Sequence, residues 1–255
     1  PYTAVDATQA FVSTLPAGMF VFEIGISQGT LVVDALSDCV DVLGGVLDTP
    51  DNAPATCTLT EDKSQGIVVR NQQGFILDCA GHRITHRDGP GNYGVAFNNA
   101  AEVGVKNCDI DSNGDGVFIF NAADVDFSNV HVVNRQAEIC TAPGICVVYE
   151  PGDGLVVSWA GAIHGRDFSV SGATNGLSLD NAVQVELVAA TATDFNVLSD
   201  VSTGLMSLSS TLVHVSGLRV EGAATERGFY FFPRNDSVTV ESCDIAVPTG
   251  IGLVL

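Results

Sequence analysis

The sequence predicts an all-β solenoid, in which short strands from successive repeats stack into parallel sheets. Three observations predict this fold. A glycine followed by a large apolar residue recurs along the chain, at Gly66, Gly94, Gly116, Gly154, Gly176, Gly204, Gly228 and Gly250. The intervals are 28, 22, 38, 22, 28, 24 and 22 residues, so the shortest is the repeating unit and the longer ones contain insertions. Each unit contains three short apolar patches with the two-residue period of a strand.

A single unit is too small to bury its own apolar side chains. Units must therefore stack, with equivalent strands about 4.8 Å apart. Alignment on the glycines then assigns each side chain to the inside or the outside. It predicts one internal ladder, formed by Val103, Val125, Ile163, Val185 and Val213.

The segment CDIDSNGDGVFIF, residues 108–120, allows two interpretations. It resembles a calcium loop of the EF-hand type through four alternating residues, Asp109, Asp111, Asn113 and Asp115. Such a loop needs a bidentate Glu at its twelfth position, where this chain has Phe120. The preferred interpretation is a turn between two units, since Asn and Gly accept left-handed conformations and EPGDGL and HRDGPGNYG occupy comparable junctions. Calcium binding is the alternative; otherwise no metal or cofactor is expected.

The segment GIVVRNQQGFILDCAGHRITHRDGPGNYGVAF, followed by NCDIDSNGDGV, resembles the right-handed parallel β-helix repeat of the pectin-lyase-like superfamily. The resemblance covers about Cys57 to Leu255, and LDCAGHRIT is its most specific part. It implies three parallel sheets that run the length of a cylinder. It does not imply one activity, because this fold hosts lyases, hydrolases, epimerases, phage spikes and adhesins.

Residues 1–65 lack the repeat and are expected to form an N-terminal cap and entry segment, because an open solenoid end exposes apolar strands. Residues 66–255 are expected to form the β-helix, with about seven coils. At the other end GIGLVL begins another unit and stops, so either the natural chain continues past Leu255 or a partner covers that edge.

Thirty acidic residues against ten basic ones give a formal charge of −20. Nucleic acid and anionic membranes are therefore not expected as partners, because a polyanion is repelled. No apolar run approaches the roughly 18 residues that span a bilayer, so no membrane insertion is expected. Seven cysteines favour an oxidising compartment, and hence an extracellular or cell-surface location.

Two cysteine pairs are candidates for disulfides. Cys140 and Cys146 lie in the one long insertion, where a disulfide would hold a loop without a core of its own. Cys39 and Cys57 flank a stretch rich in Gly, Asp and Pro, and would link the cap.

The other three cysteines are expected in different environments. Cys108 and Cys243 point inward on distant units, so they are expected to be buried as small apolar side chains and not to pair with each other. Cys79 lies in a turn and is either free or paired with a neighbouring cysteine.

The outer face of the first strand is mostly apolar. It predicts a contact surface, formed by Val68, Phe118, Phe120, Val156, Met206, Tyr230 and Phe232. The alternatives are that insertions fold over this face, or that sugars stack on its aromatic rings. Polysaccharide lyases of the superfamily use acidic calcium ligands and a basic residue here. In this chain only Arg70, Asn98 and Asp180 could serve, and Asp180 lies three units beyond Asn98, so a lyase of that type is not supported.

The outer face of the second strand places ionisable residues on successive units. Asp126, His164, Glu186 and His214 form one column, with Arg166 beside it. Alternating acid and imidazole at the strand spacing would hold an acid/base pair, and Arg166 would bind a uronate carboxylate. The alternative is that these are ordinary solvated side chains.

His82 and His86 flank a short strand and are expected to be structural rather than metal ligands. Two functions follow from the sequence. The first is an extracellular structural or surface-interaction protein, such as a filament, sheath, spike or adhesin subunit, that contacts its own copies or another surface protein. The second is a carbohydrate-active enzyme, a lyase, hydrolase or uronate epimerase, that acts on an acidic polysaccharide.

Overall fold

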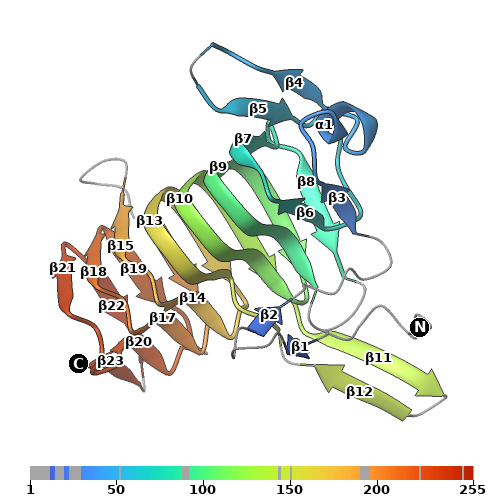
Figure 1. The fold of residues 1–255 in the computed structure, drawn as a ribbon. Coiled ribbons are helices and arrows are strands. Elements are labelled where there is room, and N and C mark those ends of the chain that lie inside the picture. The colour runs from blue at the N-terminus through green and yellow to red at the C-terminus, as the bar shows by residue number, and fades with distance from the viewer. Residues whose placement is uncertain are drawn as a thin grey trace.

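The computed structural model describes residues 12–14, 20–22, 30–51, 53–87, 92–142, 145–149, 151–189, 196–223, 225–248 and 250–254. The fold is the right-handed parallel β-helix that the sequence predicts. Its strands wrap into coils that stack along one axis, from the blue N-terminal end to the red C-terminal end of Figure 1. Each regular coil contributes one strand to each of three parallel sheets.

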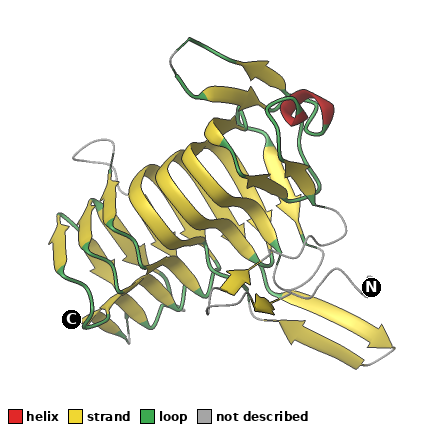
Figure 2. Ribbon diagram, viewed as in Figure 1, coloured by secondary structure: helices red, strands yellow, loops and turns green. Residues whose placement is uncertain are grey.

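Three long strands, β9 (Tyr93–Ser112), β10 (Asp115–Asn134) and β13 (Leu155–Ser171), bend round all three sheets (Figure 2). The first sheet contains their opening residues and β3 (Leu31–Val33), β6 (Ile67–Arg70), β14 (Asn175–Asp180), β17 (Thr203–Leu208), β20 (Arg227–Phe231) and β23 (Ile251–Val254). The second contains their middle residues and β5 (Ala55–Thr58), β7 (Gln73–Asp78), β15 (Gln184–Val188), β18 (Leu212–Ser216) and β21 (Ser237–Glu241). The third contains their last residues and β8 (Arg83–His86), β16 (Asn196–Ser199), β19 (Leu218–Glu221) and β22 (Asp244–Ala246).

The parallel register begins earlier than residue 66, which corrects the expected domain boundary. Leu31 pairs with Ile67, and β5 pairs in parallel with β7. This first coil also contains the short helix α1 (Asp38–Asp41) and β4 (Val46–Asp48), which pairs antiparallel with β5. The expected Cys39–Cys57 disulfide is present and joins α1 to β5.

Two antiparallel hairpins lie outside the three parallel sheets. One consists of β1 (Val12–Thr14) and β2 (Phe20–Phe22), and the other of β11 (Ala137–Ala142) and β12 (Ile145–Tyr149). The second hairpin is the insertion between β10 and β13. Its backbone register places Cys140 opposite Cys146, but these side chains lie outside the described part of the chain, so the disulfide between them stays a prediction.

The predicted internal ladder is confirmed. Val125 pairs with Val103 on one side and Ile163 on the other, and the column continues through Val185 to Val213. All five side chains are at most 2% exposed. Apolar side chains from the three strands of each coil therefore fill the centre of the cylinder in layers.

The repeated glycine provides space at the corner between the third sheet and the first. A Cβ on Gly116 would lie 2.2 Å from Cγ1 of Val132 and 2.6 Å from the carbonyl oxygen of Gly154. An inward third-strand side chain thus occupies the place of the missing Cβ. The last unit corrects the sequence alignment: Leu253 pairs with Phe229, so the glycine equivalent to Gly228 is Gly252 and not Gly250.

A second disulfide joins Cys79 to Cys108, which corrects the expectation that Cys108 is a reduced, buried thiol. The register pairs Asp78 with Lys106, so Cys79 and Cys108 lie on adjacent coils and differ by one position along the strand. Their Cα atoms are 4.9 Å apart. Among the described side chains Cys243 is the free cysteine. Within the same part of the chain, no helix combines the length and the apolar character needed to cross a membrane.

Candidate functional site

The second sheet presents the predicted column of ionisable side chains on its outer face. Strand pairing places Asp126 beside His164, His164 beside Glu186, and Glu186 beside His214. The two-residue period of the strands explains this arrangement. Ile163 and Val185, which directly precede His164 and Glu186, point into the core, so the histidine and the glutamate point outward. Arg166 lies two residues beyond His164 and pairs with Ser128, as the sequence register predicts.

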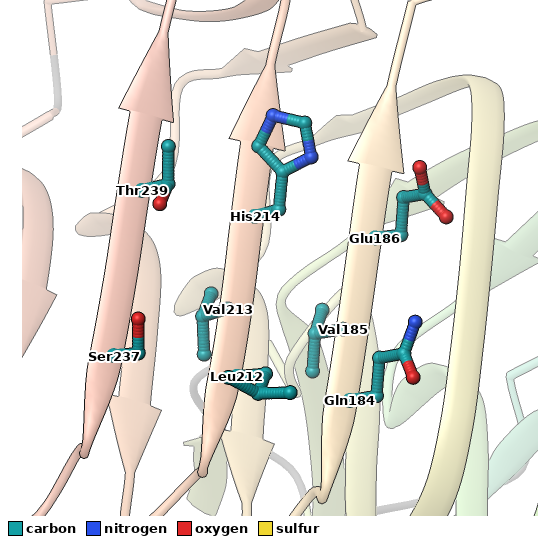
Figure 3. Close-up of a pocket in the computed structure, with 8 residues that line it drawn as sticks. All are labelled: Gln184, Val185, Glu186, Leu212, Val213, His214, Ser237 and Thr239. Atoms are coloured by element: carbon teal, nitrogen blue, oxygen red, sulfur yellow. The ribbon is translucent and has the colours of Figure 1, made fainter.

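The column lies in a series of hollows that together form one groove, here called the second-sheet groove. Figure 3 shows its C-terminal part, where Glu186, His214 and Thr239 lie side by side on three neighbouring strands. The adjoining hollow has a volume of about 460 Å³ and is lined by Asp126, His164, Gly165, Arg166, Glu186, Val188 and Ala189. A third hollow is lined by Pro54, Ile76, Glu102, Val103, Asp124, Val125, Asp126 and His164. Because neighbouring hollows share Asp126, His164 and Glu186, the groove extends across several coils.

His164 and Glu186 are in contact within the groove. Nδ1 of His164 lies 3.2 Å from Oε2 of Glu186, and the side chains are 43% and 46% exposed. His214 is farther from a carboxylate, with its Nε2 3.9 Å from Oε2 of Glu241. Because both side chains still face solvent, the imidazole can donate a hydrogen bond to a ligand and the carboxylate can accept one.

The outer face of the first sheet is less open than the sequence predicts. Val68 is 3% exposed, so this member of the predicted contact surface does not lie on a free surface. Phe118, Phe120, Val156, Met206, Tyr230 and Phe232 are each half-buried. The rings of Phe118 and Phe120 are stacked with centroids 6.4 Å apart, and those of Tyr230 and Phe232 meet edge to face at 4.6 Å.

The four candidate calcium ligands do not come together. The carboxylate of Asp111 accepts hydrogen bonds from Arg87 and Arg135. Asn113 uses its side-chain amide to donate to the backbone carbonyl of Arg87 at 2.8 Å. In the described ranges no group of three or more His, Cys, Asp or Glu side chains is placed to hold a metal ion.

Both candidate histidines have structural contacts, as expected. His86 is 1% exposed, and its Nδ1 lies 2.7 Å from the backbone carbonyl oxygen of Tyr93. His82 contacts Asp62 at 3.3 Å. His86 also lies against Gly66, where an added Cβ would come within 2.5 Å of its Nδ1.

Sequence reasoning missed a pair of largely buried carboxylates, Asp115 and Asp153. The backbone N–H of Asp153 donates to Oδ1 of Asp115 at 2.9 Å, and the side chain of Asn175 donates to Oδ1 of Asp153 at 2.9 Å. Burial raises the pKa of Asp115 to about 7, and burial also raises the pKa of Asp153. The signal in the sequence was the Asp-Gly that recurs at 115–116 and 153–154, which indicated turns but not burial.

This pair predicts a specific pH dependence of stability. The pKa of Asp115 is about 7 in the folded chain, against an ordinary value of 3.8, so between these pH values the folded state binds the extra proton. The contribution of Asp115 to the free energy of unfolding is therefore greatest below pH 4 and decreases as the pH rises toward 7. The loss should be about 2 kcal/mol after allowance for residual solvent contact.

Asp115→Asn keeps an oxygen that accepts from the Asp153 N–H but removes the titration. We expect urea unfolding at pH 5 and pH 8 to show a smaller difference in stability for this variant than for the wild type. Asp236→Asn, in an exposed turn, reports the effect of removing one surface carboxylate. Equal pH dependence in the wild type and in Asp115→Asn would contradict this account.

Comparison with known proteins agrees with the architecture. The family model described as the right-handed β-helix region matches residues 55–152, from the start of β5 to just before β13. The searches of curated proteins and of solved structures gave no match. With its parallel sheets, stacked coils and this match, the chain is a right-handed parallel β-helix repeat protein.

Proposed function

We propose that this protein is an extracellular surface-interaction β-helix that binds an extended, uncharged polysaccharide in the second-sheet groove. The observation that supports this most is the column of Asp126, His164, Glu186 and His214 on successive coils. Equivalent positions repeat about every 4.8 Å along the solenoid axis. A linear sugar chain that follows this axis therefore meets hydrogen-bonding groups at each coil.

The charges in the groove favour a neutral ligand over an acidic one. Asp124, Asp126 and Glu186 line it alongside Arg166, and the whole chain has a formal charge of −20. A polyanion would be repelled over most of its length. Sugar hydroxyl groups, in contrast, donate readily to carboxylates and accept from imidazole and guanidinium N–H groups.

Two disulfides support an extracellular location, because such bonds persist in oxidising compartments. The outer face of the first sheet offers less exposed apolar surface for self-association than the sequence predicted. Val68 and Ala96, at one end of this face, are 3% and 0% exposed. The half-buried aromatic rings on that face already contact each other. The second-sheet groove is therefore the better candidate for the interaction surface.

Affinity electrophoresis tests the proposal. The wild-type chain should migrate more slowly in native gels that contain a soluble neutral polysaccharide, with β-glucan, xyloglucan and galactomannan as probes. Glu186→Gln and His164→Ala should each weaken binding about tenfold, a loss of about 1.4 kcal/mol. Glu186→Gln removes the charge and replaces an accepting carboxylate oxygen with a donating NH2 group, and His164→Ala removes the imidazole.

Matched controls are available on the third sheet. Glu221→Gln and His131→Ala make the same chemical changes on β19 and β10, outside the residues that line the groove. They should migrate like the wild type. Retardation that is unchanged in both groove variants, or absent for the wild type with every polysaccharide, would refute the proposal.

A second candidate function is a carbohydrate-active enzyme, and the contact between His164 and Glu186 at 3.2 Å favours it. A touching imidazole and carboxylate are the groups that general acid/base catalysis uses. Arg166 in the same groove would bind the carboxylate of a uronate residue. Acidic and neutral polysaccharides should be incubated with the chain and analysed for unsaturated ends, new reducing ends and altered uronate stereochemistry. Turnover that survives in both Glu186→Gln and His164→Ala would exclude catalysis at this site.

A further inference from the structure

The only tryptophan of the sequence, Trp159, has an unusual backbone conformation and an exposed ring. Its φ is +57°, in the left-handed region, and the residue is 59% exposed. Bulky side chains rarely adopt this conformation. An exposed apolar ring held in a strained turn indicates a function rather than a contribution to the core.

The neighbouring coils show what this turn normally contains. Strand pairing aligns the residues on either side of Trp159 with those of the other coils. The equivalent residues also have positive φ and are Asn71, Asn99, Asn121, Asn181 and Ser209. Asparagine suits the left-handed conformation, and the amide of Asn121 donates to Oδ1 of Asn99 at 2.6 Å. Trp159 lies where most of the coils have asparagine, and its indole ring has no side-chain amide to continue such a hydrogen bond along the row.

Trp159 lies at the turn of β13 that leads into the second sheet, where β13 lines the groove with His164. It precedes Ala162 and His164 on the same strand, β13. Gly161 and Ala162 are small and half-buried, whereas the residues paired with Ala162 on the adjoining coils are Asp124 and Gln184. The stretch of β13 between Trp159 and His164 therefore carries small side chains on its outer side. Further along the same edge, Val183 and Leu212 are 56% and 50% exposed.

We infer that Trp159 is a stacking platform for a pyranose ring, and that it forms an additional subsite of the groove. This inference rests on the proposed function. A pyranose has an apolar C–H face that packs on an indole ring, and hydroxyl groups at its rim that need polar partners. Asn121 and Asn181 flank Trp159 on the adjoining coils and provide side-chain amides, and Asp180 adds a carboxylate next to Asn181. Such a polar surround fits a sugar better than an apolar protein surface.

Tryptophan fluorescence tests the inference directly, because emission excited at 295 nm comes from Trp159 alone. The probe is whichever of β-glucan, xyloglucan and galactomannan retards the wild type most. Adding it should shift the emission to shorter wavelength and reduce quenching by acrylamide. The same polysaccharide should bind Trp159→Asn at least about tenfold more weakly, and Trp159→Phe with an intermediate affinity, because a smaller aromatic ring remains.

Trp159→Asn also separates this function from a structural role. Asparagine suits the turn, so the variant should be folded, with a melting temperature about 2 °C above the wild type. A lower melting temperature would overturn the strain argument. Unchanged affinity in Trp159→Asn would overturn the subsite while the proposed function stands, and a wild type that no polysaccharide retards would overturn both. Emission that responds to protein concentration but not to sugar would assign Trp159 to a protein contact and overturn the subsite.

Discussion

Val125→Asp is expected to prevent the coils from stacking and to remove the cooperative unfolding transition. Val125 is 1% exposed and lies between Val103 and Ile163 in the internal ladder. A carboxylate at this position would be surrounded by apolar side chains with no partner for its charge. The destabilisation should exceed about 5 kcal/mol, which places it among the most damaging single substitutions.

Far-ultraviolet circular dichroism during heating, combined with limited proteolysis, measures this effect. Ala123→Asp is the matched control, because it introduces the same carboxylate at an exposed position two residues earlier on β10. The control should stay within about 0.5 kcal/mol of the wild type. If Val125→Asp melts at the wild-type temperature, or if the two variants are equally damaged, the register of the ladder is wrong.

This register could be predicted from the sequence because two independent patterns agree. The glycine spacing defines the coil, and the two-residue alternation separates Val125, inside, from Asp126, outside. The first coil escaped prediction because Thr30 lies where the next coil has Gly66, and because α1 and β4 interrupt the coil. In the last coil GIG offers two glycines, each followed by an apolar residue. A shift by two keeps every side chain on its own face, so alternation does not discriminate between them.

The candidate site was predictable to a similar extent. The column from Asp126 to His214 follows from the register alone, because strand pairing brings equivalent positions together. The burial of Asp115 and the exposure of Trp159 depend on how the turns and corners pack, which a repeat alignment does not contain. Trp159 did differ from Asn121 and Asn181 in the aligned turns, but its significance needs the positive φ.

The Cys79–Cys108 disulfide also depends on how the turns pack, which a repeat alignment does not contain. Removing this bond should cause the second largest loss of stability among the variants proposed. The two cysteines are 29 residues apart, slightly more than the 28 residues between the paired Asp78 and Lys106. The bond therefore closes a loop of about one coil, and this loop reduces the conformational entropy of the unfolded chain. Loop-closure entropy predicts a loss of about 3.6 kcal/mol for the double variant Cys79→Ala and Cys108→Ala. Alanine is chosen because Cys79 and Cys108 are 0% and 1% exposed, and a serine hydroxyl there would need a new partner.

Urea unfolding of the wild type and the double variant, with and without a thiol reductant, assigns the loss to this bond. Reductant should destabilise the wild type more than the double variant, since the variant keeps only the Cys39–Cys57 disulfide among the two described here. Cys243→Ala, which removes the free thiol, should respond to reductant as the wild type does. A wild type whose free energy of unfolding is the same under both conditions would show that neither disulfide forms. It would also remove the main support for an extracellular location, because a chain that gains nothing from oxidation has no need of an oxidising compartment.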